Sequence, residues 1–179
     1  MDLLTDRFLL RDFLPADATA FAAYHTDPRY AHFYAEEVAD PAHAVGLLAT
    51  FREWAAQEPR LNFQLAVVAR TEPHALIGCV GVRRAGQPPG HAEFGIELAP
   101  DYWGRHGYAV EIGRGLLDFA FRDLKVGVIT GATVAANTRI SRLAAWFGAE
   151  IAMNDSGDWR AVQWRLTRER WEQRAPRVL

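Results

Sequence analysis

Residues 92–124 read AEFGIELAPDYWGRHGYAVEIGRGLLDFAFRDL and hold the most informative pattern in the chain. The first seven residues alternate between apolar and polar or small side chains, which is the two-residue period of a strand. From Ile112 onward, apolar residues recur at helical spacing. The two patterns meet at Gly104 and Gly107. The segment therefore predicts a strand, a glycine-bearing turn and a long helix over residues 104–124.

Further elements are predicted on both sides of this unit. Apolar runs typical of strands occupy residues 7–14, 62–69, 75–83 and 126–134, and the tail reads as a hairpin of residues 150–153 and 159–166. Helical patterns occupy residues 16–24, 39–56 and 137–148, and Gly148 is placed to end the last one. We expect one α/β (α+β) domain over residues 1–179, with a mixed, mostly antiparallel central sheet and helices on both faces.

Composition excludes several classes of protein. With 20 basic and 22 acidic side chains and a net charge of −2, the chain lacks the clustered positive charge that nucleic acids and anionic membranes require. Cys79 is the sole cysteine, and the six histidines occur singly, without the spacing of a metal site. No apolar run approaches the ~18 residues of a membrane span. We expect a cytoplasmic protein without a metal.

The connection after the strand is a candidate phosphate site. The first N–H groups of a helix have no partner within it, and together with the helix dipole they attract phosphate oxygens. Gly104 and Gly107 would let a phosphate approach the main chain. Taken alone, the glycines are weak evidence, because a glycine-bearing turn before a helix is common as a tight connection that binds nothing. Their spacing fits neither GxxxxGK[ST] nor a GxGxxG followed by an acidic residue, so ATP and NAD are not indicated.

Four segments, in this order, resemble the GNAT superfamily of N-acetyltransferases, and within it the ribosomal-protein N-terminal acetyltransferases. They are TDRFLLR at residues 5–11, AEFGIEL at 92–98, YWGRHGYAVE at 102–111, and NTR at 137–139 followed by Phe147 and Gly148. The resemblance implies a GNAT-like acyl-CoA N-acyltransferase fold and direct acetyl transfer from acetyl-CoA to a primary amine. The acceptor would be a protein N-terminus or a small molecule. A CoA-binding module without activity is the alternative, and a monomer and a homodimer are both compatible.

The resemblance also implies cofactor-binding residues. The turn would hold the CoA pyrophosphate through Gly104, Arg105, His106, Gly107, Tyr108 and Ala109, and an N–H near Leu98 would polarise the thioester carbonyl. Asn137 would contact the pantetheine arm, and Arg142 would lie near the nucleotide. From the residues alone, Asn137 reads as a helix N-cap and Arg142 as a surface side chain. The pair Arg105 and His106 departs from the single basic residue that is usual in this branch.

Catalytic candidates follow from the chemistry of amine acylation. Ammonium groups hold their proton with a pKa of ~10.4 in lysine or ~7.7 to 8 at an α-amine, so a base is required. Glu93 and Glu97 share one face of the predicted strand, either as solvated charges or as acid–base groups. We favour Glu93 as base, with Glu97 as its substitute or as a binder of the acceptor's positive charge. Ser141 or water would protonate the thiolate, because the tyrosine of many relatives is Ala144 here.

The lead-in to the second helix, residues 26–40, is rich in aromatic side chains. Tyr30, Phe33 and Tyr34 fall within it. They either pack on the core or line an acceptor pocket.

Overall fold

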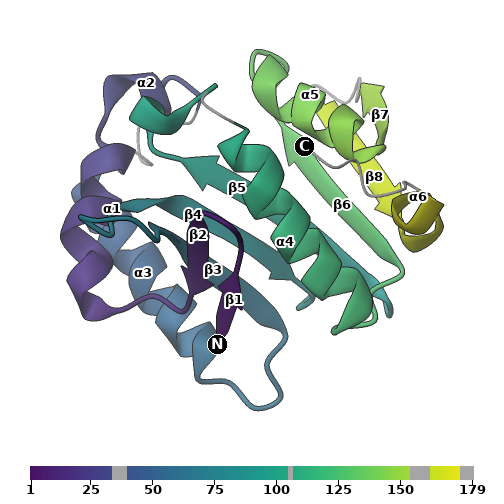
Figure 1. Cartoon of the computed structure of the whole chain (residues 1–179), viewed down its shortest axis with the longest axis horizontal. Coiled ribbons are helices and arrows are strands. Elements are labelled where there is room, and N and C mark those ends of the chain that lie inside the picture. The colour runs from purple at the N-terminus through teal and green to yellow at the C-terminus, as the bar shows by residue number, and fades with distance from the viewer. Residues whose placement is uncertain (34–39, 105–106, 154–161, 174–179) are drawn as a thin grey trace.

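The computed structural model describes residues 1–33, 40–104, 107–153 and 162–173. Its strands form one sheet in the order β1-β2-β3-β4-β5-β6-β8-β7 (Figure 1). The strands are β1 (Asp2–Leu4), β2 (Phe8–Arg11), β3 (Asn62–Ala69), β4 (Leu76–Arg83), β5 (His91–Leu98), β6 (Val128–Thr133), β7 (Glu150–Met153) and β8 (Val162–Thr167). All neighbours pair antiparallel except β5 and β6, which are parallel. The predicted mixed, mostly antiparallel sheet is confirmed.

Helices cover both faces of this sheet (Figure 1). One face carries α4 (Tyr108–Arg122) and α5 (Thr138–Phe147), and the other carries α1 (Ala18–His25) and α3 (Pro41–Ala55). The shorter helices are η1 (Pro15–Asp17), α2 (Pro28–Ala31), η3 (Pro100–Tyr102) and α6 (Arg168–Gln173). Helices on both faces were expected, and the arrangement is that of an α/β fold.

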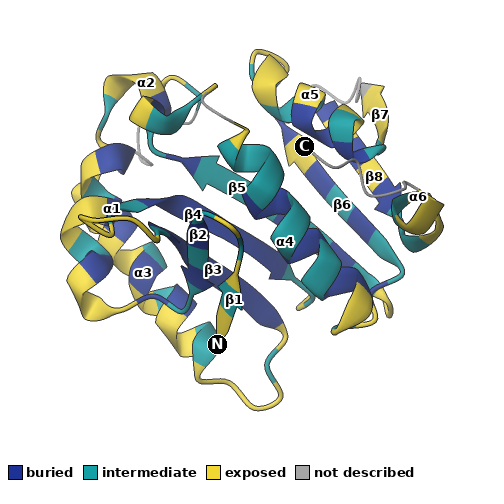
Figure 2. Cartoon of the chain, in the orientation of Figure 1, coloured by how far each residue is buried: buried dark blue, intermediate teal, exposed yellow. Residues whose placement is uncertain are grey.

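β3 shows how the two cores share the sheet. Leu65 and Val67 belong to the cluster under α4, whereas Ala66 and Val68 belong to the cluster under α1 and α3. Successive side chains of a strand point to opposite faces, so β3 is buried on both sides (Figure 2). This explains its uninterrupted run of buried residues, which a strand with one solvated face would not show.

Several bounds differ from those predicted. The strand predicted at residues 7–14 is present as β2 but ends at Arg11, and it is preceded by β1, which was not predicted. The two strands form a hairpin closed by the bond from Thr5 N–H to Phe8 C=O. The helix predicted from residue 104 begins only at Tyr108, because Gly104 and Gly107 have φ of +67° and +69°, outside the right-handed helical region. α6 was not predicted, and residues 159–161 of the predicted last strand lie outside the described residues.

The sheet divides between β5 and β6. Their pairing is confined to His91 with Val128, Ala92 with Ile129 and Glu93 with Thr130. β5 continues to Leu98 and β6 to Thr133, and β6 pairs along its whole length with β8 on its other side. The two strands therefore diverge after Glu93, and a slot opens within the sheet.

Candidate active site

A cavity of about 410 Å³, called the larger cavity below, opens at this slot. Its wall includes the end of β5, residues 102–104 of the turn, the first residues of α4 and one side of α5. A smaller cavity of about 200 Å³ adjoins it, lined by polar residues of β3 to β5 and by apolar residues of α5 and β8. The two cavities share Phe33, Ile96, Glu97, Asn137, Ile140 and Leu143. A bound molecule in one would thus meet a bound molecule in the other beside Glu97.

The start of α4 faces the larger cavity. Gly107 is the N-cap residue in a left-handed conformation and, as a glycine, has no side chain with which to cap the helix. The larger cavity is lined by Gly104 and by Gly107, Tyr108, Ala109 and Val110. The N–H groups of the first helical turn and the positive end of the helix dipole can therefore attract an anion in this cavity. Arg105 and His106, predicted for the same site, lie outside the described residues.

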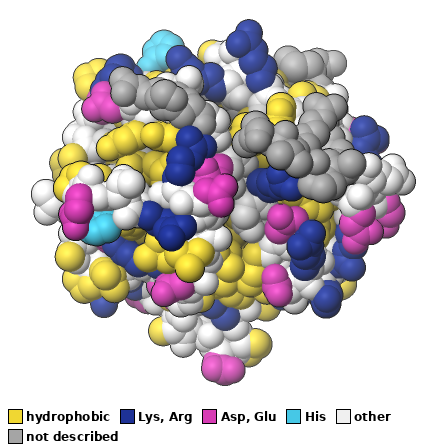
Figure 3. Space-filling model, in the orientation of Figure 1, with side chains coloured by type: hydrophobic (Ala, Val, Ile, Leu, Met, Phe, Trp, Pro, Cys, Tyr) yellow, Lys and Arg dark blue, Asp and Glu magenta, His cyan; other side chains and the backbone are white. Residues whose placement is uncertain are grey.

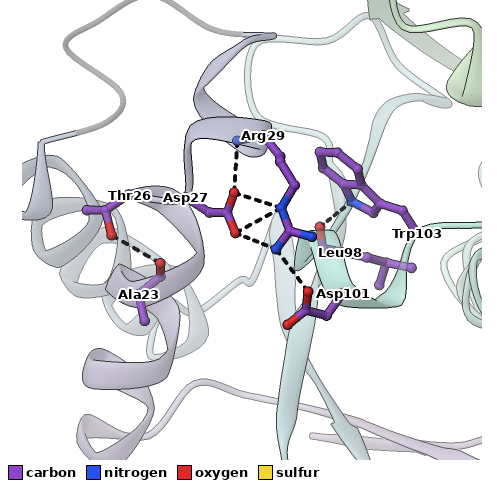
Figure 4. A network of polar contacts seen from close by, with 7 residues as sticks. All are labelled: Ala23, Thr26, Asp27, Arg29, Leu98, Asp101 and Trp103. Atoms are coloured by element: carbon purple, nitrogen blue, oxygen red, sulfur yellow. Dashed lines mark hydrogen bonds and ion pairs between the residues drawn. The ribbon is translucent and has the colours of Figure 1, made fainter.

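A hydrogen bond fixes the turn between β5 and α4. The indole Nε1 of Trp103 donates to the carbonyl oxygen of Leu98 at 2.6 Å (Figure 4). Ala99 N–H donates to Ile77 C=O in β4 at 2.8 Å. Since hydrogen-bonding directions alternate along an antiparallel strand, the N–H of Leu98 points away from β4, toward the slot. The carbonyl oxygen of Leu98 thus accepts a hydrogen bond from Trp103, while the N–H of Leu98 faces the larger cavity.

α2 is tied to the same turn from the other side. The Arg29 guanidinium joins Asp27 at 2.6 Å to Asp101 of η3 at 2.9 Å (Figure 4). The Phe33 ring, just beyond α2, packs edge-on against Trp103 with centroids 5.8 Å apart. The aromatic lead-in therefore borders both the core and the cavities, with Tyr30 and Phe33 among the lining residues. Tyr34 lies outside the described residues.

Glu97 is the centre of a buried polar cluster. Its Oε1 accepts from the Tyr24 hydroxyl at 2.7 Å and from the Cys79 thiol at 3.1 Å, and its Oε2 accepts from the Tyr30 hydroxyl at 2.5 Å. His25 Nε2 lies 3.5 Å from Oε1. Burial, and then the charge of Glu97, raises the pKa of the Tyr24 hydroxyl and of the Cys79 thiol well above their ordinary values. Both groups therefore stay protonated and serve as donors to the carboxylate.

Glu93 has a different environment on the same face of β5. Its Oε1 contacts the Arg83 guanidinium at 3.2 Å, and Arg83 also donates to Gln64 Oε1 at 3.0 Å. Arg83 reaches across Gly95, where a Cβ would stand 3.0 Å from its Nη2. All four residues line the smaller cavity. The shared face predicted for Glu93 and Glu97 is therefore present, but each carboxylate has its own partners.

Of the remaining predicted site residues, two line a cavity and one does not. Asn137 occupies the N-cap position of α5 without a side-chain cap bond, and it lines both cavities. Arg142 lines the larger cavity. Ser141 is among the lining residues of neither cavity. Sequence reasoning missed the roles of Tyr24, Cys79 and Trp103, because no spacing in the sequence links them to Glu97 or Leu98.

Other kinds of site were sought across the described residues. No group of three or more His, Cys, Asp and Glu side chains in this part of the chain is arranged to hold a metal ion. None of its helices combines the length and hydropathy needed to cross a membrane. On the face shown in Figure 3, the described acidic and basic side chains are interspersed.

Comparison with known proteins identifies the family. A family model described as "Acetyltransferase (GNAT) domain" matches residues 7–150. The "Uncharacterized N-acetyltransferase YoaA" of Bacillus subtilis (strain 168) is 26% identical over 147 residues, covering 82% of this chain and 81% of that protein. The structure of the ribosomal-protein-S5-alanine acetyltransferase from Vibrio fischeri is similar, with a TM-score of 0.74, 19% identity and coverage of 96% and 98%.

A second solved structure, Mycobacterium smegmatis RimJ in complex with CoA-disulfide, has a TM-score of 0.72 at 16% identity and covers 94% of this chain and 87% of its own. At these identities the structures establish the fold, which confirms the GNAT-like architecture. The family match runs from the turn before β2 to the start of β7 and includes every lining residue of the larger cavity and all but Trp164 of the smaller one. The chain belongs to the GNAT acetyltransferase family.

Proposed function

We propose that the protein transfers an acetyl group from acetyl-CoA directly to a primary amine. The observation that carries this proposal is the meeting of two cavities at Glu97, inside the slot between β5 and β6. One cavity is large and ends at a helix start whose N-cap residue is a glycine, as a long molecule with a pyrophosphate requires. The other is small and lined by carboxylates, as an amine requires.

In the larger cavity, the pyrophosphate would lie against the N–H groups of Gly107, Tyr108 and Ala109, with Gly104 beside them. The exposed guanidinium of Arg142 would face the nucleotide end, and Asn137 would contact the arm where the cavities join. Apolar side chains such as Val110 and Leu143 would pack along the arm. The Leu98 N–H would then donate to the thioester oxygen as negative charge develops on it.

For the base we favour Glu97, which reverses our sequence-based preference for Glu93. Glu97 borders both cavities, whereas Glu93 lines only the smaller one and is ion-paired with Arg83. A base must lie within hydrogen-bond reach of the nitrogen that attacks, directly or through one water. Glu97 meets this requirement at the junction, and Glu93 would bind the positive charge of the arriving ammonium.

A covalent acetyl-cysteine intermediate is not part of this proposal. Cys79 is buried, and its raised pKa disfavours the thiolate that would act as nucleophile. The amine would therefore attack the thioester itself. Ser141, away from both cavities, loses support as the acid.

The acceptor is a peptide N-terminus or a small amine. The names of two solved neighbours, one a ribosomal-protein-S5-alanine acetyltransferase and the other a putative ribosomal-protein-serine acetyltransferase, favour the first. A module that binds CoA without catalysis is the competing function. A cytoplasmic location and a single domain over residues 1–179 stay predictions.

The test is thiol release from acetyl-CoA across a panel of N-terminal peptides and small amines. Turnover with any member supports the enzyme and identifies its acceptor class. Acetyl-CoA at ~100 times its Kd should also stabilise the fold by ~2.7 kcal/mol. Stabilisation without turnover would favour the binding module, and the absence of both would overturn the cofactor assignment.

A further inference from the structure

We propose that Tyr30 is the general acid that protonates the departing CoA thiolate, in a relay with Glu97. The inference rests on the proposed function, and it replaces Ser141 or water as the acid expected from a sequence that has alanine at position 144. It starts from one contact, the hydrogen bond of the Tyr30 hydroxyl to Glu97 Oε2 at 2.5 Å.

The positions of Tyr30 and Glu97 place this hydrogen bond between the two cavities. Glu97 lines both cavities, whereas Tyr30 lines only the larger one. A proton released by the amine in the smaller cavity must reach sulfur in the larger one. The Glu97–Tyr30 pair connects these two sides of the site through a hydrogen bond that already exists.

Tyr30 is held in place by the surrounding fold. It lies in α2, is 3% exposed, and packs edge-on against Tyr24 with centroids 5.5 Å apart. The backbone N–H of Tyr30 donates to Asp27 C=O at 2.9 Å, and Asp27 is tied through Arg29 to the turn at Asp101. The phenol is therefore supported by the same contacts that join α2 to the wall of the larger cavity.

The proton transfers balance over one turnover. The ammonium first loses one proton to water. The neutral amine nitrogen then forms its bond to the acetyl carbon and gives a second proton to the Glu97 carboxylate. The C–S bond breaks with its electron pair on sulfur, and the Tyr30 hydroxyl gives its proton to that sulfur. Protonated Glu97 then returns a proton to the Tyr30 oxygen. The products are an amide and a thiol, and both side chains regain their starting states.

Tyr24 provides a matched control. Its hydroxyl also donates to Glu97, at 2.7 Å, and it is 6% exposed, but it lines neither cavity. Tyr24→Phe and Tyr30→Phe each remove one phenolic donor from the same carboxylate. The loss of a hydrogen bond to Glu97 is common to both variants, and only Tyr30→Phe should remove the acid.

The first experiment measures kcat for both variants with acetyl-CoA and with acetyl-selenocoenzyme A. A selenol is more acidic than a thiol, so the selenolate leaves without needing a proton. With acetyl-CoA, we expect Tyr30→Phe to lower kcat ~100-fold and Tyr24→Phe less than ~10-fold. With the selenoester, the defect of Tyr30→Phe should fall to that of Tyr24→Phe. Equal defects in the two variants, or a defect that is the same for both donors, would overturn the inference.

A second measurement does not depend on turnover. The thiolate fraction of bound CoA, read from its ultraviolet absorbance over a pH series, should be smaller in Tyr30→Phe than in wild type, because a phenol that donates to sulfur stabilises the thiolate. It should be unchanged in Tyr24→Phe. Should Tyr30→Phe fail to fold, a fluorinated tyrosine at position 30 keeps the hydroxyl and makes it more acidic. The basic limb of the kcat profile should then move to lower pH, and an unmoved limb would count against the relay.

Failure of the inference is distinguishable from failure of the proposed function. If the wild-type protein turns over and the kcat defects of Tyr24→Phe and Tyr30→Phe are equal, the role of Tyr30 is overturned and acetyl transfer still stands. A wild-type protein that releases no thiol with any amine, and is not stabilised by acetyl-CoA, would overturn both.

Discussion

The indole of Trp103 donates its N–H to the carbonyl oxygen of Leu98 at 2.6 Å. The bond joins the last residue of β5 to the residue that follows η3. It supplies a donor to a carbonyl oxygen that makes no bond to β6, because β5 and β6 have diverged before Leu98. The turn is thereby held next to the N–H that we assign to the thioester oxygen.

Replacement of Trp103 by Phe should impair acetyl-CoA use. Leaving a partly buried carbonyl without its donor costs ~1 to 3 kcal/mol, and the turn would lose its position. We expect kcat/KM for acetyl-CoA to fall ~10-fold and the melting temperature to drop. Trp146→Phe is the control, because Trp146 lines the same cavity without a hydrogen bond to the turn in the described structure. Equal kinetics in the two variants would refute this role.

Substitutions of Glu97 and Glu93 should change different kinetic parameters. Glu97→Gln removes the proposed base, and kcat should fall by ~10² to 10⁴ while stabilisation by acetyl-CoA is kept. Glu93→Gln should mainly raise KM for the amine, because its carboxylate lies only in the smaller cavity. Steady-state kinetics against both substrates measure the split. A Glu93→Gln variant with the larger loss of kcat would restore the sequence-based assignment.

The lack of a side chain at Gly95 leaves room for the Arg83 guanidinium, and this role can be tested. A Cβ at Gly95 would stand 3.0 and 3.3 Å from the two terminal nitrogens of Arg83, so the guanidinium would shift from Glu93. Gly95→Ala should therefore raise KM for the amine several-fold and leave KM for acetyl-CoA unchanged. Gly46→Ala, on the exposed side of α3 with open space around its Cβ position, is the control and should add ~0.5 to 1 kcal/mol of stability.

Glu111 should contribute to the pH dependence of stability. Burial acts to raise the pKa of Glu111, but hydrogen bonds from Thr5 and Arg7 outweigh burial and leave the pKa below its ordinary value. A lowered native-state pKa means stability that is complete above the unfolded-state pKa and is lost as pH falls through the folded value.

Glu111→Gln should be ~2 kcal/mol less stable than wild type at pH 7, and this gap should narrow as the pH falls below ~4. Denaturant unfolding at a series of pH values measures it. Glu53→Gln is a suitable comparison, because Glu53 lies on the exposed side of α3. A gap that is constant with pH would show that packing, and not the carboxylate charge, is responsible.

Much of the fold was predictable because it depends on local patterns. The bounds of β3, β5 and α5 lie within one or two residues of those predicted. Their apolar residues follow a regular spacing, because each element is buried either along one face or, in β3, on both faces. β1 was missed because its three residues gain stability only by pairing with β2. Pairing partners are a tertiary property, and no local pattern reports them.

The candidate site was predictable in part for the same reason. Gly107 and the common face of Glu93 and Glu97 follow from turn chemistry and strand period. The ties of Tyr24 and Tyr30 to Glu97 join positions 73 and 67 residues apart, so they follow only from the packing of α1 and α2 on the sheet. Ser141 was chosen for its hydroxyl alone, and its place on α5 keeps it from both cavities.

The divergence of β5 and β6 has a consequence for solubility as well as for binding. Unpaired strand edges normally lie at the rim of a sheet, where a second chain can add to them and start aggregation. Here the open edges lie in the interior of the sheet, with α4 and α5 across one side and α2 beside the mouth. A flexible arm can enter this gap, but a whole foreign strand would meet the surrounding helices. The fold thus places these unpaired groups in the interior of the sheet and not at its rim.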